Sequence, residues 1–201
     1  MKTKTVWISC ILAVLFCGRT ADATVIIALD QVGSNVVAMG SGTINFTDLT
    51  FDDPGSFHPF INPIGGVLAL GETSAFAMIF FDLYSGMSGP GSFGSGLFAP
   101  PSTSTGSQLF LGAPTLIGLP VDYVSGMPLD SAATWNNTTL VALGVTPKTT
   151  FTWTWGSGAN ADSLTLEIGF APEPAPALLL SLGAAGLVLL KWRSSMRNRR
   201  P

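Results

Sequence analysis

The sequence predicts an all-β protein: a single β-sandwich or jelly-roll-like domain, flanked by an N-terminal signal peptide and a C-terminal transmembrane helix. Apolar and β-branched residues alternate with serine and threonine over many short stretches, which is the period of a half-buried strand. The chain also contains 23 glycines and 14 prolines, which interrupt these stretches at short intervals. Nothing between residues 24 and 171 has a capped helical period. We therefore expect a signal peptide at 1–23, a β-rich extracytoplasmic domain at 24–171 and a separate C-terminal segment at 172–201.

The first 23 residues have the three parts of a secretory signal peptide. Lys2 and Lys4 supply positive charge, residues 6–17 form an apolar run, and Ala21 and Ala23 are the small residues that a signal peptidase needs. The apolar run is too short for a membrane anchor. We expect cleavage after Ala23.

Both cysteines, Cys10 and Cys17, lie within this apolar run. Lipid attachment at Cys17 is the alternative, but the bulky Phe16 precedes it where a small residue is wanted. The mature chain is therefore expected to have no disulfide, no thiol nucleophile and no thiolate metal site.

Short strands are expected throughout the β-rich domain, and those near its end are the clearest. In residues 150–155, Phe151, Trp153 and Trp155 share one face while three threonines take the other. Residues 163–170 alternate in the same way. The predicted strands are residues 24–29, 36–49, 108–111, 115–119, 132–135, 139–143, 150–155 and 162–170. The apolar run at 75–83 is the closest candidate for a helix but fits a buried strand equally well.

Glycine, proline and aspartate mark the expected breaks between these strands. We expect a turn at 30–33, an interruption at Asp52-Asp53-Pro54-Gly55, and surface loops over most of 84–107.

Charge is distributed unevenly along the chain. The formal net charge is −3, but residues 24–171 carry ten acidic side chains against the single base Lys148, a net charge of −9. Nucleic-acid binding needs a basic face that neutralises phosphates, so this class of function is excluded.

The C-terminal segment combines three features. Pro172, Glu173 and Pro174 come first, and the uncharged apolar run 175–190 follows. This run of 16 residues spans roughly 24 Å as a helix, so it is barely long enough to cross a bilayer. A basic cluster then ends the chain and is expected to stay in the cytoplasm: Lys191, Arg193, Arg197, Arg199 and Arg200.

This arrangement resembles the PEP-CTERM sorting signal of exported bacterial proteins. The resemblance covers residues 172–200 and implies cleavage near Pro172-Glu173-Pro174 by an exosortase-type membrane protease. It implies an inner-membrane intermediate, followed by release to or attachment at the cell surface. A permanent single-span anchor would use the same span and charges and is the alternative.

A second resemblance concerns the β-rich domain. Several segments look like a recurring body of PEP-CTERM proteins, and together they cover most of 40–170: Tyr84–Pro90, 92–96, 123–126, 133–137 and 152–162. That family carries no assigned enzymatic activity, so the resemblance bears on fold and localisation.

Few residues could carry out chemistry. His58 is the only histidine, and no nucleophile-elbow pattern accompanies it, so a catalytic triad is not expected. Asp48, Asp52 and Asp53 could form an oxygen cage for Ca²⁺, although a solvated acidic turn is the preferred interpretation. A pair of carboxylates, as in glycosidases, has almost no diagnostic value among ten acids.

Trp135, Trp153 and Trp155 are the remaining candidates. They could stack on sugars if exposed, although filling of a sandwich core is the preferred interpretation. We therefore expect an exported, non-enzymatic protein of the cell surface or extracellular matrix, without a cofactor, associated with extracellular polysaccharide. A carbohydrate- or calcium-binding module and a secreted hydrolase are the alternatives.

Overall fold

The computed structural model describes residues 24–71 and 78–170 of the 201-residue chain. The predicted signal peptide with Ala21 and Ala23, the Pro172-Glu173-Pro174 motif, the span at 175–190 and the basic cluster after it all lie outside the described residues. Within the described ranges, no helix is long and apolar enough to cross a membrane.

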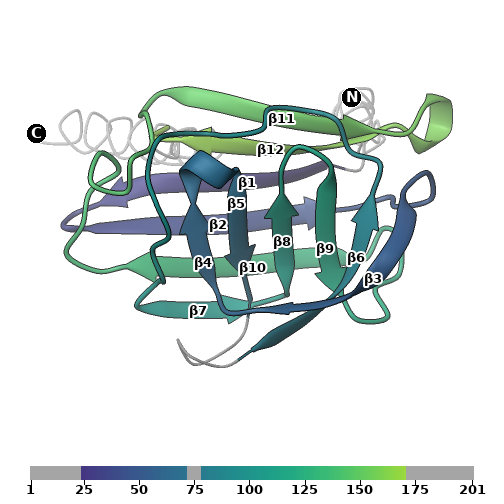
Figure 1. Cartoon of the computed structure of the whole chain (residues 1–201), viewed down its shortest axis with the longest axis horizontal. Helices are drawn as coiled ribbons and strands as arrows, with labels where there is room; N and C mark the ends of the chain where they lie inside the picture. The colour runs from purple at the N-terminus through teal and green to yellow at the C-terminus, as the bar shows by residue number, and fades with distance from the viewer. Residues whose placement is uncertain (1–23, 72–77, 171–201) are drawn as a thin grey trace, which may run out of the picture. The chain divides into compact units, whose positions relative to one another are not determined.

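The described residues form two six-stranded sheets, so the predicted all-β class is confirmed (Figure 1). Helical structure there is limited to the short 3-10 turns η2 (Pro63–Gly65) and η3 (Gly158–Asn160). The strands are β1 (Thr24–Val32), β2 (Asn35–Thr43), β3 (Thr50–Phe57), β4 (Phe60–Asn62), β5 (Val67–Leu70), β6 (Ile79–Ser85), β7 (Thr103–Gly106), β8 (Leu109–Gly112), β9 (Leu116–Pro120), β10 (Pro128–Trp135), β11 (Thr149–Trp155) and β12 (Asp162–Ile168).

The first sheet has the order β11-β12-β1-β2-β10-β7, and the second has the order β3-β6-β9-β8-β5-β4. Neighbouring strands are antiparallel in both sheets, except that β1 and β12 pair in parallel. The parallel pair joins the first and the last strand of the described chain. The two sheets form two layers, and the strands of one cross those of the other (Figure 1).

The main core lies between the two sheets and follows from the alternation of the strands. In β1 every second residue is apolar and fully buried, and β12 repeats this pattern with Leu164, Leu166 and Ile168. In β11, Trp153 and Trp155 are buried while Thr150, Thr152 and Thr154 are exposed. The predicted faces of the last two strands are therefore confirmed.

A smaller apolar cluster lies on the outer face of the second sheet. Its buried members are Ala69, Ile79, Phe81 and Phe110. Ala69 of β5 and Phe110 of β8 alternate along their strands with residues of the main core. The strands β5 and β8 are consequently apolar on both faces.

Three predictions of local structure were wrong. The strand predicted at 36–49 ends at Thr43 as β2, and residues 44–49 lie outside any strand. Asp52-Asp53-Pro54-Gly55 does not interrupt the chain, because it lies inside β3. This strand is at the edge of its sheet, and a shift of register between Phe51 and Pro54 absorbs the irregularity.

Residues 139–143 do not form a strand. The N–H of Leu143 donates to the carbonyl of Thr139 at 3.0 Å, and that of Val145 donates to Leu140 at 3.1 Å, which closes two successive turns. Leu140, Leu143 and Val145 are buried in the main core. The apolar side chains of this segment therefore reach the core from two successive turns. A strand pattern, in which every second residue faces the core, does not predict this arrangement.

The glycine-rich segment 86–102 packs closely against both sheets. Met87 and Phe93 are buried in the main core, Ser88 forms a β-bridge with Thr154 of β11, and Ala99 forms one with Ile61 of β4. Glycine is required where the backbones approach most closely, because a Cβ atom at Gly96 would overlap the carbonyl oxygen of Leu143. This segment therefore covers one edge strand of each sheet.

We predict that Gly118→Ala destabilises the protein by about 1–3 kcal/mol. The added Cβ would lie 2.8 Å from Cβ of Phe110 and 3.0 Å from Leu83 Cδ2, so the outer cluster must move. Gly91→Ala is the matched control, because nothing lies within 4 Å of its added Cβ. Urea unfolding would measure both variants, and equal free energies of unfolding would contradict the packing described here.

Candidate functional site

The three tryptophans of the β-rich domain are core residues. Trp135, Trp153 and Trp155 have exposed fractions of 3%, 0% and 4%, so they present no ring face on which a sugar could stack. The sugar-binding alternative for these side chains must be corrected accordingly. The burial follows from the position of β10 and β11, whose inward faces are covered by the second sheet and by the loops.

Each buried indole has a hydrogen-bond partner in a loop. Nε1 of Trp135 donates to the carbonyl of Ala99 at 3.1 Å, Nε1 of Trp153 to Pro90 at 2.9 Å, and Nε1 of Trp155 to Asn45 at 2.8 Å. A buried indole N–H needs such an acceptor. The tryptophans therefore fix the loops around the first sheet.

The acidic turn does not assemble a metal cage. Oδ1 and Oδ2 of Asp48 accept hydrogen bonds from Asn160 Nδ2 at 2.8 Å and from the Ser157 N–H at 3.2 Å. Oδ1 of Asp52 instead accepts from the hydroxyl of Ser85 at 2.9 Å. Among the described residues no group of three or more histidine, cysteine or acidic side chains could hold a metal ion. The calcium candidate formed by Asp48, Asp52 and Asp53 is not supported by this geometry.

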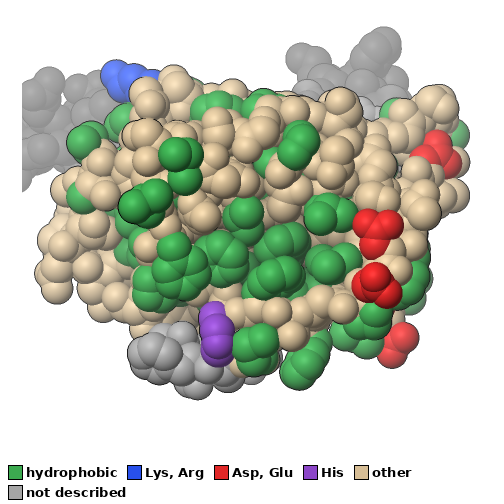
Figure 2. All heavy atoms as spheres, viewed as in Figure 1, with side chains coloured by type: hydrophobic (Ala, Val, Ile, Leu, Met, Phe, Trp, Pro, Cys, Tyr) green, Lys and Arg blue, Asp and Glu red, His purple; other side chains and the backbone are tan. Residues whose placement is uncertain are grey.

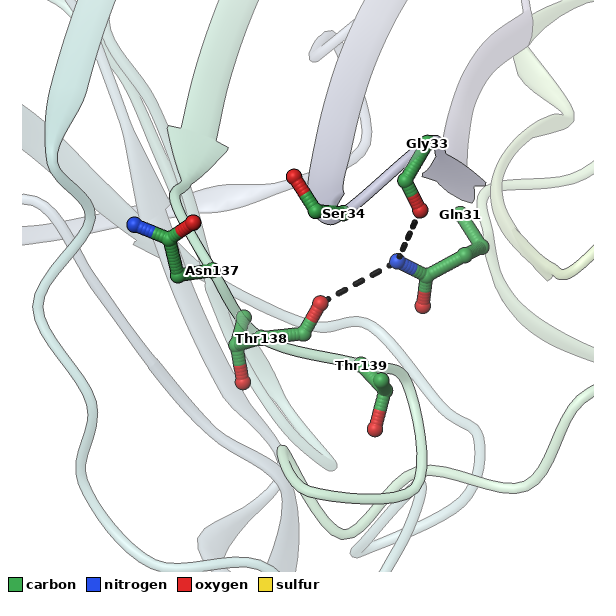
Figure 3. Close-up of a pocket in the computed structure, with 6 residues that line it drawn as sticks. All are labelled: Gln31, Gly33, Ser34, Asn137, Thr138 and Thr139. Atoms are coloured by element: carbon green, nitrogen blue, oxygen red, sulfur yellow. Dashed lines mark hydrogen bonds between the residues drawn. The ribbon is translucent and has the colours of Figure 1, made fainter.

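An open depression of about 480 Å³ lies at one end of the first sheet (Figure 3). It is lined by uncharged residues from the β1–β2 turn and from the segment after β10: Gln31, Gly33, Ser34, Asn137, Thr138 and Thr139. A second depression of about 240 Å³, which Met78 and Gln108 help to line, also lacks a carboxylate. Neither depression therefore offers the facing acids that a glycosidase uses.

The side-chain amide of Gln31 joins the two loops that line this depression. Its Nε2 lies 3.1 Å from the carbonyl oxygens of both Gly33 and Thr138, and its Oε1 accepts from the N–H of Leu140 at 3.1 Å (Figure 3). These groups are occupied by the fold itself. The role that the geometry shows for Gln31 is to join two loops.

The apolar outer face of the second sheet is the most distinctive surface of the described residues. We call it the Phe face and define it by five side chains: Phe57, Phe60, Phe81, Phe98 and Phe110. Figure 2 shows hydrophobic side chains gathered over the middle of this side of the molecule, with carboxylates toward one end of the view. Of its five members Phe98 is exposed, Phe57 and Phe60 are half-buried, and Phe81 and Phe110 are buried.

The rings of the Phe face touch one another across strands. Phe57 of β3 stacks on Phe110 of β8 with centroids 4.6 Å apart and an interplanar angle of 5°. Phe60 of β4 contacts Phe98 with a centroid distance of 4.9 Å. Phe81 is buried, whereas Phe98 is 58% exposed. The Phe face thus combines buried rings with an exposed ring at Phe98.

Sequence analysis did not identify the Phe face. The signal for it was present in the runs Ile79-Phe80-Phe81 and Leu109-Phe110-Leu111, where consecutive apolar residues indicate a strand that is buried on both faces. Phe57, Phe60 and Phe98 come from other strands and a loop, so only the folded chain brings the five rings together.

Asp162 is one of two buried carboxylates among the described residues. Its Oδ2 accepts from the N–H of Asn45 at 2.6 Å and its Oδ1 from the N–H of Ser163 at 2.6 Å. Burial raises the pKa of Asp162, and the two N–H donors oppose this effect. The side chain joins the start of β12 to the segment after β2, which is a structural role.

Comparison with known proteins returned no match among family models, curated proteins or solved structures.

We predict that Asp48→Ala lowers the free energy of unfolding by about 1 kcal/mol, because it removes two hydrogen bonds to the loop around η3. Asp53→Ala, a change at an exposed position of β3, is the control and should stay within about 0.5 kcal/mol of the parent. Urea unfolding with and without Ca²⁺ would measure both. A calcium-dependent gain in the parent that Asp48→Ala abolishes would instead show that Asp48 is a calcium ligand.

Proposed function

We propose that this chain is an exported, non-enzymatic protein of the cell surface or extracellular matrix, sorted by its C-terminal segment. The observation that carries the proposal is the order of Pro172-Glu173-Pro174, the uncharged run 175–190 and the basic cluster. The resemblance of this order to a PEP-CTERM signal makes an exosortase-type membrane protease the expected partner.

The chemistry of the segment supports transient residence in the membrane. A run of 16 uncharged residues is a marginal span, and five cations with no acid among them resist translocation. The signal peptide at 1–23 would start export and this segment would stop it. Two prolines bias the motif away from helix, so a protease could bind it as an extended strand.

The β-rich domain is consistent with a role that depends on surfaces. Its net charge of −9 and its lack of cysteine suit a soluble, disulfide-free body outside the cytoplasm. The two depressions described above carry no carboxylate. These features favour a contact function over catalysis.

We predict that Glu173→Ala leaves membrane insertion intact but stops processing. Glu173 precedes the apolar run, so its removal does not alter the span. The expected product is a full-length, membrane-bound precursor, detected by immunoblotting of cell fractions and by mass spectrometry of the C-terminus. Asp130→Ala, an exposed change in β10, is the control and should be processed normally. Equal processing of Glu173→Ala and the parent would leave a permanent anchor as the function of the segment.

A second candidate function is binding of an uncharged polysaccharide, and the Phe face is the observation that favours it. The face offers exposed ring surface at Phe98 and carries no charged side chain among its five members. The domain's net charge of −9 would repel an anionic polymer. The apolar face of a neutral sugar ring fits such a surface. This candidate keeps the association with extracellular polysaccharide but moves it from the tryptophans to the phenylalanines.

We predict that Phe98→Ala weakens binding to a neutral polysaccharide about three- to tenfold, equivalent to about 0.7–1.4 kcal/mol. Phe98 is 58% exposed, so the change should cost little stability. Phe80→Ala is the matched control: Phe80 is 63% exposed but alternates with Phe81 along β6, so it lies on the opposite face of the sheet. Affinity electrophoresis through a neutral glucan and an anionic polymer would measure both. Equal retention of the two variants would remove the Phe face as a binding site.

A further inference from the structure

One buried carboxylate oxygen is without a partner. Asp30 of β1 is 7% exposed, and its Oδ1 has no hydrogen-bond partner. A buried polar atom in this state needs an explanation, because ionising it there costs free energy that a hydrogen bond or counterion would otherwise offset.

The position of Asp30 places it beside a second acid. Val25, Ile27 and Leu29 of β1 face the core, so Asp30 lies on the outer face of the first sheet. In the parallel neighbour β12, Leu166 and Ile168 face the core, and Glu167 therefore shares the outer face.

The register of the parallel pair makes the two acids diagonal neighbours. Glu167 is paired with Ala28, two residues before Asp30. Among the described residues, the strands that pair with β1, namely β2 and β12, contain no cationic side chain. Its partner across β2 is Val37, and Lys148 reaches this region through its backbone, whose N–H donates to the carbonyl of Ile168. No salt bridge within the described residues neutralises Asp30.

We propose that Asp30 is a proton-operated lock on the parallel β1–β12 pair. When it is uncharged, the two strands close over it. When it is ionised, repulsion from Glu167 and the loss of hydration loosen this end of the first sheet. The lock acts where the first and last strands of the described chain meet, and it does not depend on the proposed function.

The direction of the pH dependence follows from the pKa of Asp30. Burial, and secondarily the charge of Glu167, raise the pKa of this carboxyl above its ordinary value. The folded protein then binds the proton at a higher pH than the unfolded chain. Stability should rise as the pH falls through the raised pKa, be complete below the ordinary value, and be lost as the pH rises again. A pKa raised by one unit corresponds to a tenfold change in the ratio of folded to unfolded protein.

The test compares Asp30→Asn with the parent full-length chain between pH 7 and pH 4. Asn keeps the shape of the side chain without the charge, so we expect this variant to be more stable than the parent at pH 7 and the difference to vanish toward pH 4. Asp130→Asn, which changes an exposed carboxylate on the same outer face, is the control. Its free energy of unfolding should differ from that of the parent by the same amount at every pH. The difference in free energy of unfolding between parent and variant does not contain the contribution of the buried Asp162, because both proteins carry that carboxyl.

Hydrogen exchange localises the effect and does not rely on global stability. At pH 7 the amides of Gly169, which donates to Leu29, and of Lys148, which donates to Ile168, should exchange several-fold more slowly in Asp30→Asn than in the parent. The amide of Ile61, which donates to Ala99 at the second sheet, should be unchanged. If Asp30→Asn folds poorly, an NMR titration of the Asp30 carboxyl in the parent decides the matter. A midpoint at or below the ordinary aspartate value, or an Asp30→Asn variant that is no more stable at pH 7, would overturn the proposal.

Discussion

The structure depends on three buried indole N–H groups that must find acceptors. Trp135, Trp153 and Trp155 occupy the core with their rings, and each donates to the carbonyl of a residue between strands: Ala99, Pro90 and Asn45. An unsatisfied N–H in the core would cost about 1–3 kcal/mol. Each indole therefore restricts the position of the loop that supplies its acceptor. The glycine-rich segment 86–102 receives two of the three hydrogen bonds.

This constraint has a further consequence for the edges of the sheets. With the segment 86–102 held in place, its backbone pairs with β11 at one point and with β4 at another. Exposed strand edges invite association with other chains, and a covering loop is one of the ways in which proteins prevent it. The edge strand β3 uses a different device, because its register shift and Pro54 disturb the ladder. Three of the four edge strands, β11, β4 and β3, are therefore covered or irregular.

The outer faces of the two sheets differ in composition. The outer face of the first sheet is rich in threonine on β11, whereas that of the second is built from phenylalanine. The loops that line the depression beside Gln31 are joined by the hydrogen bonds of its amide, and no acidic side chain lines it.

The sequence by itself determined the β class, the inward and outward faces of β11 and β12, and the acidic, cysteine-free character of the domain. These properties depend on composition and on a local period of two, in which the apolar side chains mark the face that is buried. Tertiary structure decided that the tryptophans are buried, that Asp52 and Asp53 belong to a strand, and that five phenylalanines meet on one face. The physical reason is that alternation shows which residues share a face, whereas burial depends on what packs against that face. For Trp153 the covering partner is Pro90, and for Phe57 it is Phe110, each more than fifty residues away.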